Sequence, residues 1–292
     1  MSTSKITNSI NKLKELLTEF GIVKNDIKTA ISNKLSVQAG EIVDVGQNMS
    51  YWAKKINSLE VSQYSDVDGM RYGNSTIREF PESWKFAPRT KDHAERMFAG
   101  CSYITTIPQL DTSKGRNFSN MFNDCSSLTT IPQLDISSGT IFSGMFSGCR
   151  SLTTIPQLDT SKGAAFSNMF YSCISLTTIP QLDTSKGTDF SYMFCYCKSL
   201  TTIPQLDTSS GANFSNMFYG CSSLTTLGGF VGLSKALSLS DSPNLTHDSL
   251  MNVINNLATV TSSTKLRLGS TNLAKLTDEE KKVATDKGWT LA

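Results

Sequence analysis

The sequence predicts an α/β solenoid, with a helical module before it and an α/β cap after it. Its main feature is a repeat, since cysteines recur every 24 residues from Cys101 to Cys221. Met-Phe pairs recur at the same interval, from Met97 to Met217. A fixed period of this length is typical of solenoids, in which each unit packs only against its two neighbours.

Each repeat predicts a strand, a turn and a short helical stretch. In the unit that begins at Cys125, residues 128–134 are apolar and β-branched, and residues 135–139 carry the Asp, Ser and Gly typical of turns. Apolar side chains from Phe142 to Cys149 follow the i, i+3, i+4, i+7 spacing of a single α-helical or 3₁₀ stretch. One unit is too small to bury its apolar face, so we expect the units to stack and bury these side chains in columns.

Residues 1–60 predict a helical module for attachment or oligomerisation. Apolar side chains at alternating spacings of four and three form an a/d seam. The seam residues are Ile6, Ile10, Leu13, Leu17 and Phe20. Because two heptads are short for a free coiled coil, the seam is either one helix of a local bundle or an oligomerisation helix that other contacts support. Isoleucine at both core positions favours three strands.

Three further segments complete the predicted organisation. Residues 61–96 predict a degenerate entry cap, because the strand pattern recurs near Pro81 but with extra residues before Met97. Residues 97–227 hold the repeats, and residues 228–292 predict an α/β cap. In that cap we expect a strand at 237–240, a helix over 250–257, a strand at 265–268, a helix that opens with a capping box at Thr277 and Glu280, and a strand at 289–291.

The repeat pattern M-F-x-x-C-x-S-L-T-x-I-P-x-L-D-T-S, from Met97 to Leu227, resembles the BspA-like class of leucine-rich-repeat proteins of gut bacteria and phages. The resemblance implies a leucine-rich-repeat solenoid. One departure is that Leu-x-x-Ile-x-x-Leu-Asp replaces the usual strand and its Asn, so the usual curvature is not implied. The end of the chain is similar to the C-terminal ends of BspA-like proteins, and residues 20–60 look like N-terminal modules of tail-fibre proteins of gut-bacterial phages.

Composition narrows the possible functions. The 27 basic and 25 acidic side chains leave a net charge of +2, and the basic residues are scattered, so we expect no nucleic-acid partner. A mean hydropathy of -0.18 and the lack of an apolar run near 18 residues predict no membrane span. Only two histidines, His93 and His247, are present, and we expect neither a metal nor another cofactor. His247 is the one candidate catalytic base, but Thr246 and Asp248 beside it indicate a helix N-cap.

The repeated polar and thiol columns each have two or more interpretations. The cysteines are either small buried packing residues or, because stacked residues lie close enough, partners in disulfides between coils; a metal site is a third alternative. The aspartates from Asp111 to Asp207 either cap the turns that follow them or line up as a calcium ladder. The Met-Phe pairs fall on the inward stripe and are predicted to be core. In each case the packing or turn interpretation is favoured.

A binding surface is predicted where the copies differ or where polar columns face outward. The pair after each Gly and the pair after each Met-Phe vary between copies, which indicates exposure. A recognition surface for a glycan or protein and simple drift at tolerant positions are both open. The candidate residues are Asn123, Tyr171, Tyr196 and Tyr219 after the Met-Phe pairs, and the glutamines Gln109, Gln133, Gln157, Gln181 and Gln205 on the other polar face.

Together these features favour a non-enzymatic binding or structural protein, because repeated equivalent polar groups argue against a unique active site. The resemblance implies a phage fibre or appendage adhesin on the virion surface. Its repeat arm would bind a host-surface or environmental glycan or protein, and its N-terminus would bind other virion proteins as a homo-oligomer, a dimer or trimer. The absence of a visible secretory signal fits a particle assembled in the host cytoplasm. The alternatives are a bacterial cell-surface leucine-rich-repeat adhesin and a cytosolic scaffold or enzyme.

Overall fold

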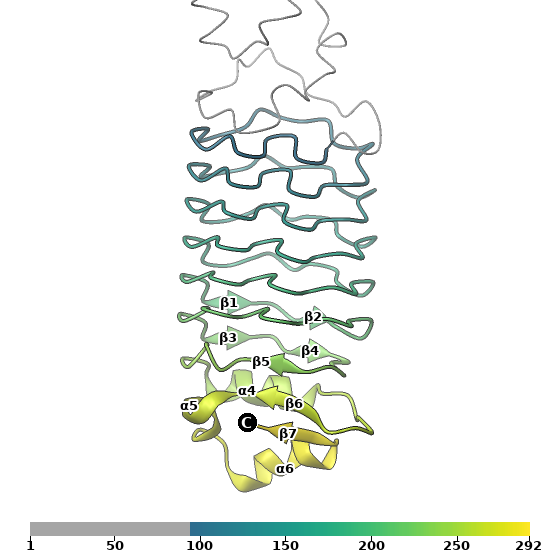
Figure 1. Cartoon of the computed structure of the whole chain (residues 1–292), viewed down its shortest axis with the longest axis vertical. Coiled ribbons are helices and arrows are strands. Elements are labelled where there is room, and N and C mark those ends of the chain that lie inside the picture. The colour runs from purple at the N-terminus through teal and green to yellow at the C-terminus, as the bar shows by residue number, and fades with distance from the viewer. Residues whose placement is uncertain (1–93) are drawn as a thin grey trace, which may run out of the picture.

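The computed structural model describes residues 94–292, and in it the repeats form a solenoid of coils stacked nearly straight on one another (Figure 1). We number five regular coils from Cys101: coil 1 is 101–124, coil 2 is 125–148, coil 3 is 149–172, coil 4 is 173–196 and coil 5 is 197–220. The predicted 24-residue solenoid is confirmed. The predicted N-terminal module with its seam, and the entry cap up to residue 93, lie outside the described residues.

Parallel backbone pairing joins consecutive coils, but the strands are shorter than the sequence predicts. β1 (Thr202–Ile203) pairs with β3 (Thr226–Leu227), and β2 (Leu206–Asp207) pairs with β4 (Phe230–Val231). The continuous strand predicted over 128–134 is not formed. Proline explains the interruption, because Pro204 lies between β1 and β2 and has no N–H to donate to a ladder.

The helical stretch predicted from Phe142 to Cys149 is wrong, because a chain of β-turns takes its place. The N–H of Met145 donates to the carbonyl of Phe142 at 3.1 Å, and the N–H of Cys149 donates to that of Phe146 at 3.1 Å. The four apolar side chains of this segment are nevertheless buried, as their spacing predicts. The i, i+3, i+4, i+7 pattern therefore marks the buried side of two consecutive turns rather than one side of a helix.

Left-handed residues explain why no helix forms there. The third residue of each turn has a positive φ, 65° at Gly144 and 74° at Gly148. A residue in this conformation cannot continue a right-handed helix. The alternate N–H groups instead donate to the next coil, as from Phe146 to the carbonyl of Met169 at 2.9 Å. The turns thus supply the hydrogen bonds between coils on this side of the solenoid.

The core consists of two stacks of phenylalanine rings that run the length of the repeats. Neighbouring rings have centroids 5.3–5.8 Å apart and nearly parallel planes in most pairs. One stack is Phe98, Phe122, Phe146, Phe170, Phe194 and Phe218, and the other is Phe118, Phe142, Phe166, Phe190 and Phe214. The methionine of each Met-Phe pair is buried beside them, which confirms the predicted core assignment.

The cysteine column packs next to the rings and also bonds to the backbone. The thiol of Cys173 donates to the carbonyl of Phe146 at 3.0 Å, and the equivalent bonds of the other coils measure 3.0–3.1 Å. All seven cysteines are buried with free thiols. Burial raises the pKa of Cys173 to about 12, so its thiol stays protonated at neutral pH. The packing interpretation of this column is confirmed, and the S–H···O bond is an addition that the sequence did not indicate.

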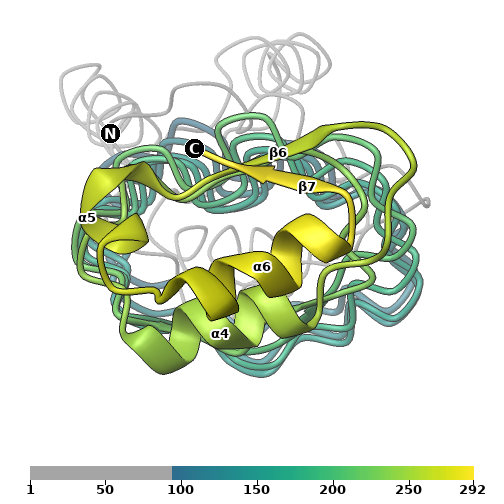
Figure 2. The ribbon, with the colours of Figure 1, turned by 90° about the horizontal axis from the view of Figure 1, so that it is seen from below.

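The C-terminal cap contains three parallel strands and three helices. The strands are β5 (Leu237–Ser238), β6 (Thr264–Arg267) and β7 (Trp289–Leu291), in the sheet order β5-β6-β7. The helices are α4 (His247–Asn255), α5 (Gly269–Leu273) and α6 (Asp278–Asp286). Seen along the solenoid, α4 and α6 lie side by side on one long side, and β6 and β7 lie on the other (Figure 2). The predicted strands and both predicted helices of the cap are confirmed.

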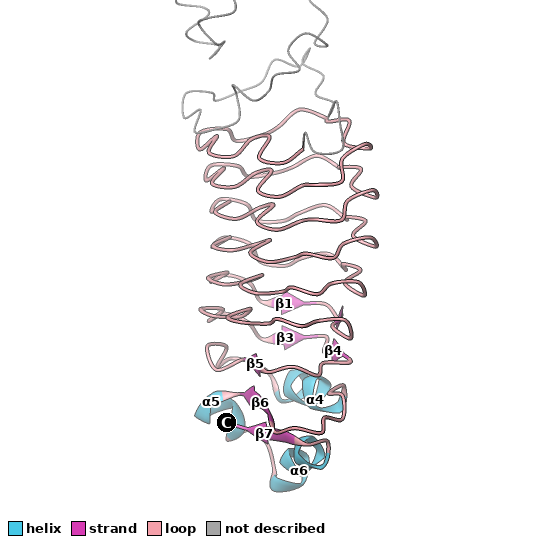
Figure 3. Cartoon of the chain, turned by 45° about the vertical axis from the view of Figure 1, so that its right-hand side comes forward, coloured by secondary structure: helices cyan, strands magenta, loops and turns pink. Residues whose placement is uncertain are grey.

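Helix α5 is the element of the cap that the sequence did not predict. It has five residues, no capping side chain at its start, and Gly269 as its first residue. Tertiary contacts hold it, because the buried amide of Asn272 donates to the carbonyls of Ser242 at 3.0 Å and Leu239 at 3.5 Å. Regular helices are confined to this end of the described chain, where none is long and apolar enough to cross a membrane (Figure 3).

The glycine after each Asp-containing turn is required by the phenylalanine stack. A Cβ at position 163 would lie 2.5 Å from Cζ of Phe166 and 2.9 Å from Cε2 of Phe142. Both contacts are with ring atoms in a close-packed column, which has little freedom to move.

We therefore expect Gly163→Ala to lower the free energy of unfolding by about 1–3 kcal/mol, as overpacking of a core does. Urea unfolding followed by circular dichroism measures this. Ala164→Ser, at the exposed neighbouring position, is the control and should change stability by less than about 0.5 kcal/mol. Equal stability of Gly163→Ala and the wild type would contradict the close packing of the ring on this glycine.

Candidate functional site

Three of the predicted tyrosines come together on the surface of coils 3 to 5. The ring of Tyr196 lies edge-to-face against that of Tyr171, with centroids 5.9 Å apart, and against that of Tyr219, with centroids 5.2 Å apart. Tyr219 is 45% exposed, and the other two are partly exposed. We call Tyr171, Tyr196 and Tyr219 the tyrosine cluster. It is an exposed aromatic surface built from three consecutive coils.

A small residue beneath the cluster makes this contact possible. Tyr171, Cys195 and Tyr219 occupy equivalent positions in coils 3, 4 and 5. Because Cys195 is small, the ring of Tyr196 can lie between the two flanking tyrosines. Cys195 is only 1% exposed, and burial raises the pKa of its thiol to about 11. Cys195 lies outside the cysteine column, and at this position it is a small, buried residue with a neutral thiol.

Two tyrosines of coil 4 have strained backbones. Tyr192 has a φ of 57° and Tyr196 a φ of 61°. The residues at the equivalent positions of the other coils are mostly Gly, Asn or Asp, which adopt this conformation more easily. They are Arg96, Asn120, Gly144, Asn168 and Asn216 for the first position, and Gly100, Asp124, Gly148, Ser172 and Gly220 for the second. The variation that the sequence analysis noted after Met-Phe therefore reflects backbone conformation as well as exposure.

Asn123, the fourth candidate of this group, is not part of the cluster. It lies in coil 1, two coils before Tyr171 in the same column, and its amide is 3.4 Å from the carbonyl of Ser147. The sequence could name the variable positions but not which of them share a surface, because that depends on the turn geometry.

The glutamine column is exposed, but its donors are used within the protein. The side-chain amide of Gln157 donates to the backbone carbonyl of Gln181 at 2.6 Å. The same bond recurs from Gln109 to Gln133, from Gln133 to Gln157 and from Gln181 to Gln205 at 2.7–2.9 Å. These side chains reinforce the stacking of the coils and leave their amide oxygens as acceptors at the surface.

An open groove of about 650 Å³ runs beside the glutamines over coils 3 to 5. Asp159, Asp183 and Asp207 also line it, together with Ser161 and Ser185. Each aspartate accepts hydrogen bonds from the serine two residues later, such as Ser161, through its N–H at 3.1 Å and its hydroxyl at 2.7 Å. These bonds lower the pKa of Asp159 and Asp183. The turn-capping interpretation of the aspartates is confirmed.

Within residues 94–292, no group of three or more His, Cys, Asp or Glu side chains is arranged to hold a metal ion.

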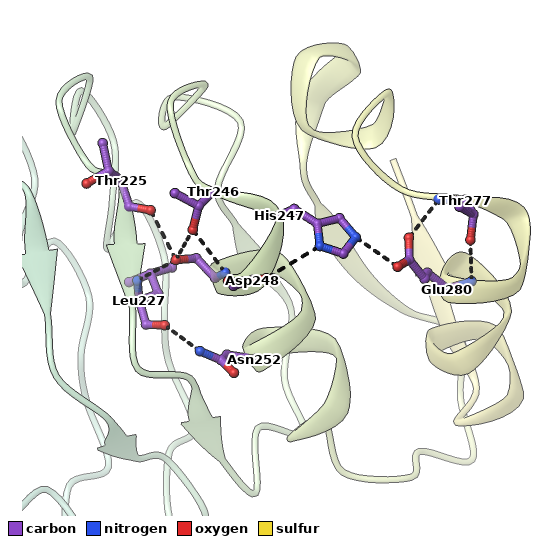
Figure 4. Close-up of polar contacts among 9 residues, drawn as sticks. Thr225, Leu227, Thr246, His247, Asp248, Asn252, Thr277 and Glu280 are labelled. Carbon is purple, nitrogen blue, oxygen red and sulfur yellow. Dashed lines mark hydrogen bonds and ion pairs between the residues drawn. The ribbon is translucent and has the colours of Figure 1, made fainter.

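The histidine singled out by the sequence analysis lies in the cap, where it joins two helix N-termini (Figure 4). Nε2 of His247 is 2.8 Å from Oε1 of Glu280. The other oxygen of Glu280 accepts the N–H of Thr277 at 2.8 Å, and the hydroxyl of Thr277 accepts the N–H of Glu280 at 3.2 Å. This is the predicted capping box, and it is confirmed. The predicted N-cap of α4 is also confirmed, since Thr246 accepts the N–H of Ser249.

The hydroxyl of Ser249 links α4 to the coil that follows coil 5 and contains β3. It donates to the carbonyl of Thr225 at 3.0 Å and accepts the N–H of Leu227 at 3.1 Å. The amide of Asn252 also points to Leu227, 3.4 Å from its carbonyl oxygen (Figure 4). The polar groups around His247 therefore bond α4 to α6 on one side and to the solenoid on the other.

Comparison with known proteins gives matches to one family model and among solved structures. The family model described as "Mycoplasma protein of unknown function, DUF285" matches residues 25–133, 92–178 and 140–231. Among solved structures, the chain is similar to a crystal structure of a T. pallidum leucine-rich-repeat protein, with 18% identity, a TM-score of 0.36, and coverage of 75% of this chain and 82% of that one. The search of curated proteins found no match.

The strain at Tyr192 predicts a stabilising substitution. Tyr192→Asn places there the residue found in coils 1, 3 and 5, and we expect it to raise the free energy of unfolding by about 1 kcal/mol. For a domain of this size that corresponds to an increase in Tm of about 2–4 °C, measurable by calorimetry. The control is Tyr103→Asn at an exposed position without a positive φ, which should give no such gain. A fall in Tm for Tyr192→Asn would refute the assigned strain.

Glu280 predicts a pH-dependent contribution of the cap. The hydrogen bonds from Thr277 and then His247 lower the pKa of Glu280 in the folded state. Its contribution to stability is therefore complete above the unfolded pKa of about 4.3 and is lost as the pH falls through the folded pKa. Compared with Glu280→Gln, we expect the wild type to be more stable at pH 7 and to lose that advantage in acid. Chemical unfolding from pH 7 to pH 3 measures the difference, with Glu279→Gln as the control; a constant difference would contradict the linkage.

Proposed function

We propose that this chain, which belongs to the DUF285 family, is a non-enzymatic adhesin that binds its ligand through the tyrosine cluster. The repeats form a rigid arm, and the cluster is a local departure from the repeat on the surface of that arm. The N-terminal segment attaches the arm to a larger assembly. In this proposal the remaining columns serve stacking, and the binding function is concentrated in coils 3 to 5.

The strained backbone of Tyr196 is the observation that carries this proposal. Most other coils have Gly or Asp at this position, and coil 3 has Ser172; a glycine would avoid the cost of about 1–2 kcal/mol. Strain of this kind persists mainly where a functional constraint retains it. The strained residue is also the central member of an exposed aromatic cluster, the composition that is enriched at binding hot spots.

The proposed role is non-enzymatic because the side chains that could act in catalysis have structural partners. An active site needs a nucleophile, a base or an electrophile that converge on one point. In the described coils the thiols are buried with raised pKa values, and the aspartates are bound to their own turns. His247 is held by Glu280 between two helices. These groups have structural partners, which supports a binding role.

The proposed location of the protein follows from its resemblance to BspA-like leucine-rich-repeat proteins of phages. On this basis the protein is a virion fibre or appendage component at the particle surface, and residues 1–60 join it to other virion proteins. The seam from Ile6 to Phe20 would make it a dimer or trimer. The alternative is a bacterial cell-surface adhesin with the same arm. The family description favours this second candidate, because it names proteins of Mycoplasma, a bacterium.

Adhesion tests the proposed function. The full-length chain, fluorescently labelled, is added to a panel of bacterial and epithelial cells, and bound protein is counted by flow cytometry. We expect saturable binding to at least one cell type, with at least a tenfold loss for the double variant Tyr171→Ser, Tyr219→Asn. These residues occur at equivalent positions in coils 2 and 1, so the fold tolerates them.

Tyr103→Ser, which removes an exposed tyrosine outside the cluster, is the matched control and should bind like the wild type. Binding to none of the cells, or equal binding by the double variant, would refute the proposal. Immunogold labelling of the source culture separates the two locations: label on virions supports the fibre assignment, and label on the cell envelope supports the alternative.

A further inference from the structure

Building on the proposed function, we propose that the ligand of the tyrosine cluster is a glycan, held by sugar rings packed on the tyrosine faces. The inference depends on the size of the cluster and the chemistry of its surface.

The cluster has the size of a short oligosaccharide rather than of a protein interface. Its two centroid steps of 5.9 and 5.2 Å place Tyr171 and Tyr219 at most about 11 Å apart. A stable protein complex needs about 800 Å² on each partner, much more than three partly exposed rings supply. Two or three consecutive sugar rings would cover the cluster.

The surface of the cluster matches the two-sided chemistry of a sugar. Each tyrosine offers an apolar ring and a hydroxyl, while a pyranose offers a face of C–H groups and a rim of hydroxyls. The interplanar angles of 84° and 82° turn successive rings nearly perpendicular, so neighbouring sugars would meet a ring face and a ring edge in turn.

The experiment uses the full-length chain and the cells that bind it. One portion of cells is treated with mild periodate, which cleaves vicinal diols of sugars, and another with proteinase K. We expect periodate to remove at least 90% of the bound protein and proteinase K to remove much less. In parallel, affinity electrophoresis through gels that contain yeast mannan, β-glucan, dextran or heparin tests direct binding.

At least one of these polysaccharides should retard the wild type and Tyr103→Ser, and should retard Tyr171→Ser and Tyr219→Asn at least tenfold less; thermal unfolding verifies that each variant is folded. Binding that survives periodate but not proteinase K would overturn the glycan and leave the adhesin proposal standing. A chain that binds no cells would instead refute the adhesin proposal itself.

Discussion

The stacking of phenylalanine rings at a 24-residue interval is the constraint on which the rest of the repeat structure depends. One coil of 24 residues cannot bury its own rings, so its stability comes from the neighbouring coils. The rings stack at 5.3–5.8 Å, and the backbone N–H groups of the turns bond to the next coil in the same register. The glycine at each ring edge, the buried thiol and the amide of each glutamine all fit this spacing. A residue inserted into one coil would disturb every column at once.

Coil 4 shows how the surface of such a structure can change without disturbing the core. The Phe, Met and Cys columns continue through it. Its turn differs, with Tyr192 and Tyr196 where most other coils carry Gly, Asn or Asp, and with the small Cys195 where coils 3 and 5 carry tyrosine. The cost is confined to two left-handed backbone positions. Because the remaining coils bury their rings independently of this turn, the solenoid tolerates the local loss of stability. Binding surfaces of solenoids can thus change one coil at a time.

The sequence predicted the period, the buried columns and most of the cap, because these depend on apolar spacing and on capping residues such as Thr277. It failed where one spacing has two structural solutions: the stripe from Phe142 to Cys149 suits a helical turn and also a pair of β-turns. The left-handed residues decided between them, and Gly, Asn and Asp at those positions were the available signal. The tyrosine cluster was predicted as separate exposed residues, since contact between Tyr171 and Tyr196 depends on the small Cys195 at the coil 4 position of the column that holds Tyr171 and Tyr219. Helix α5 has no local signal, because Asn272 holds it by tertiary contacts.

The central proposal is that the three clustered tyrosines contact the ligand directly. Nuclear magnetic resonance of the full-length chain with ¹³C-labelled tyrosine rings tests it, during titration with the polysaccharide or cell-wall extract that the chain binds. The account predicts shifts of the ring signals of Tyr171, Tyr196 and Tyr219, assigned by single substitutions, while the signal of Tyr103 stays in place. Unchanged cluster signals at a saturating concentration of ligand would contradict it.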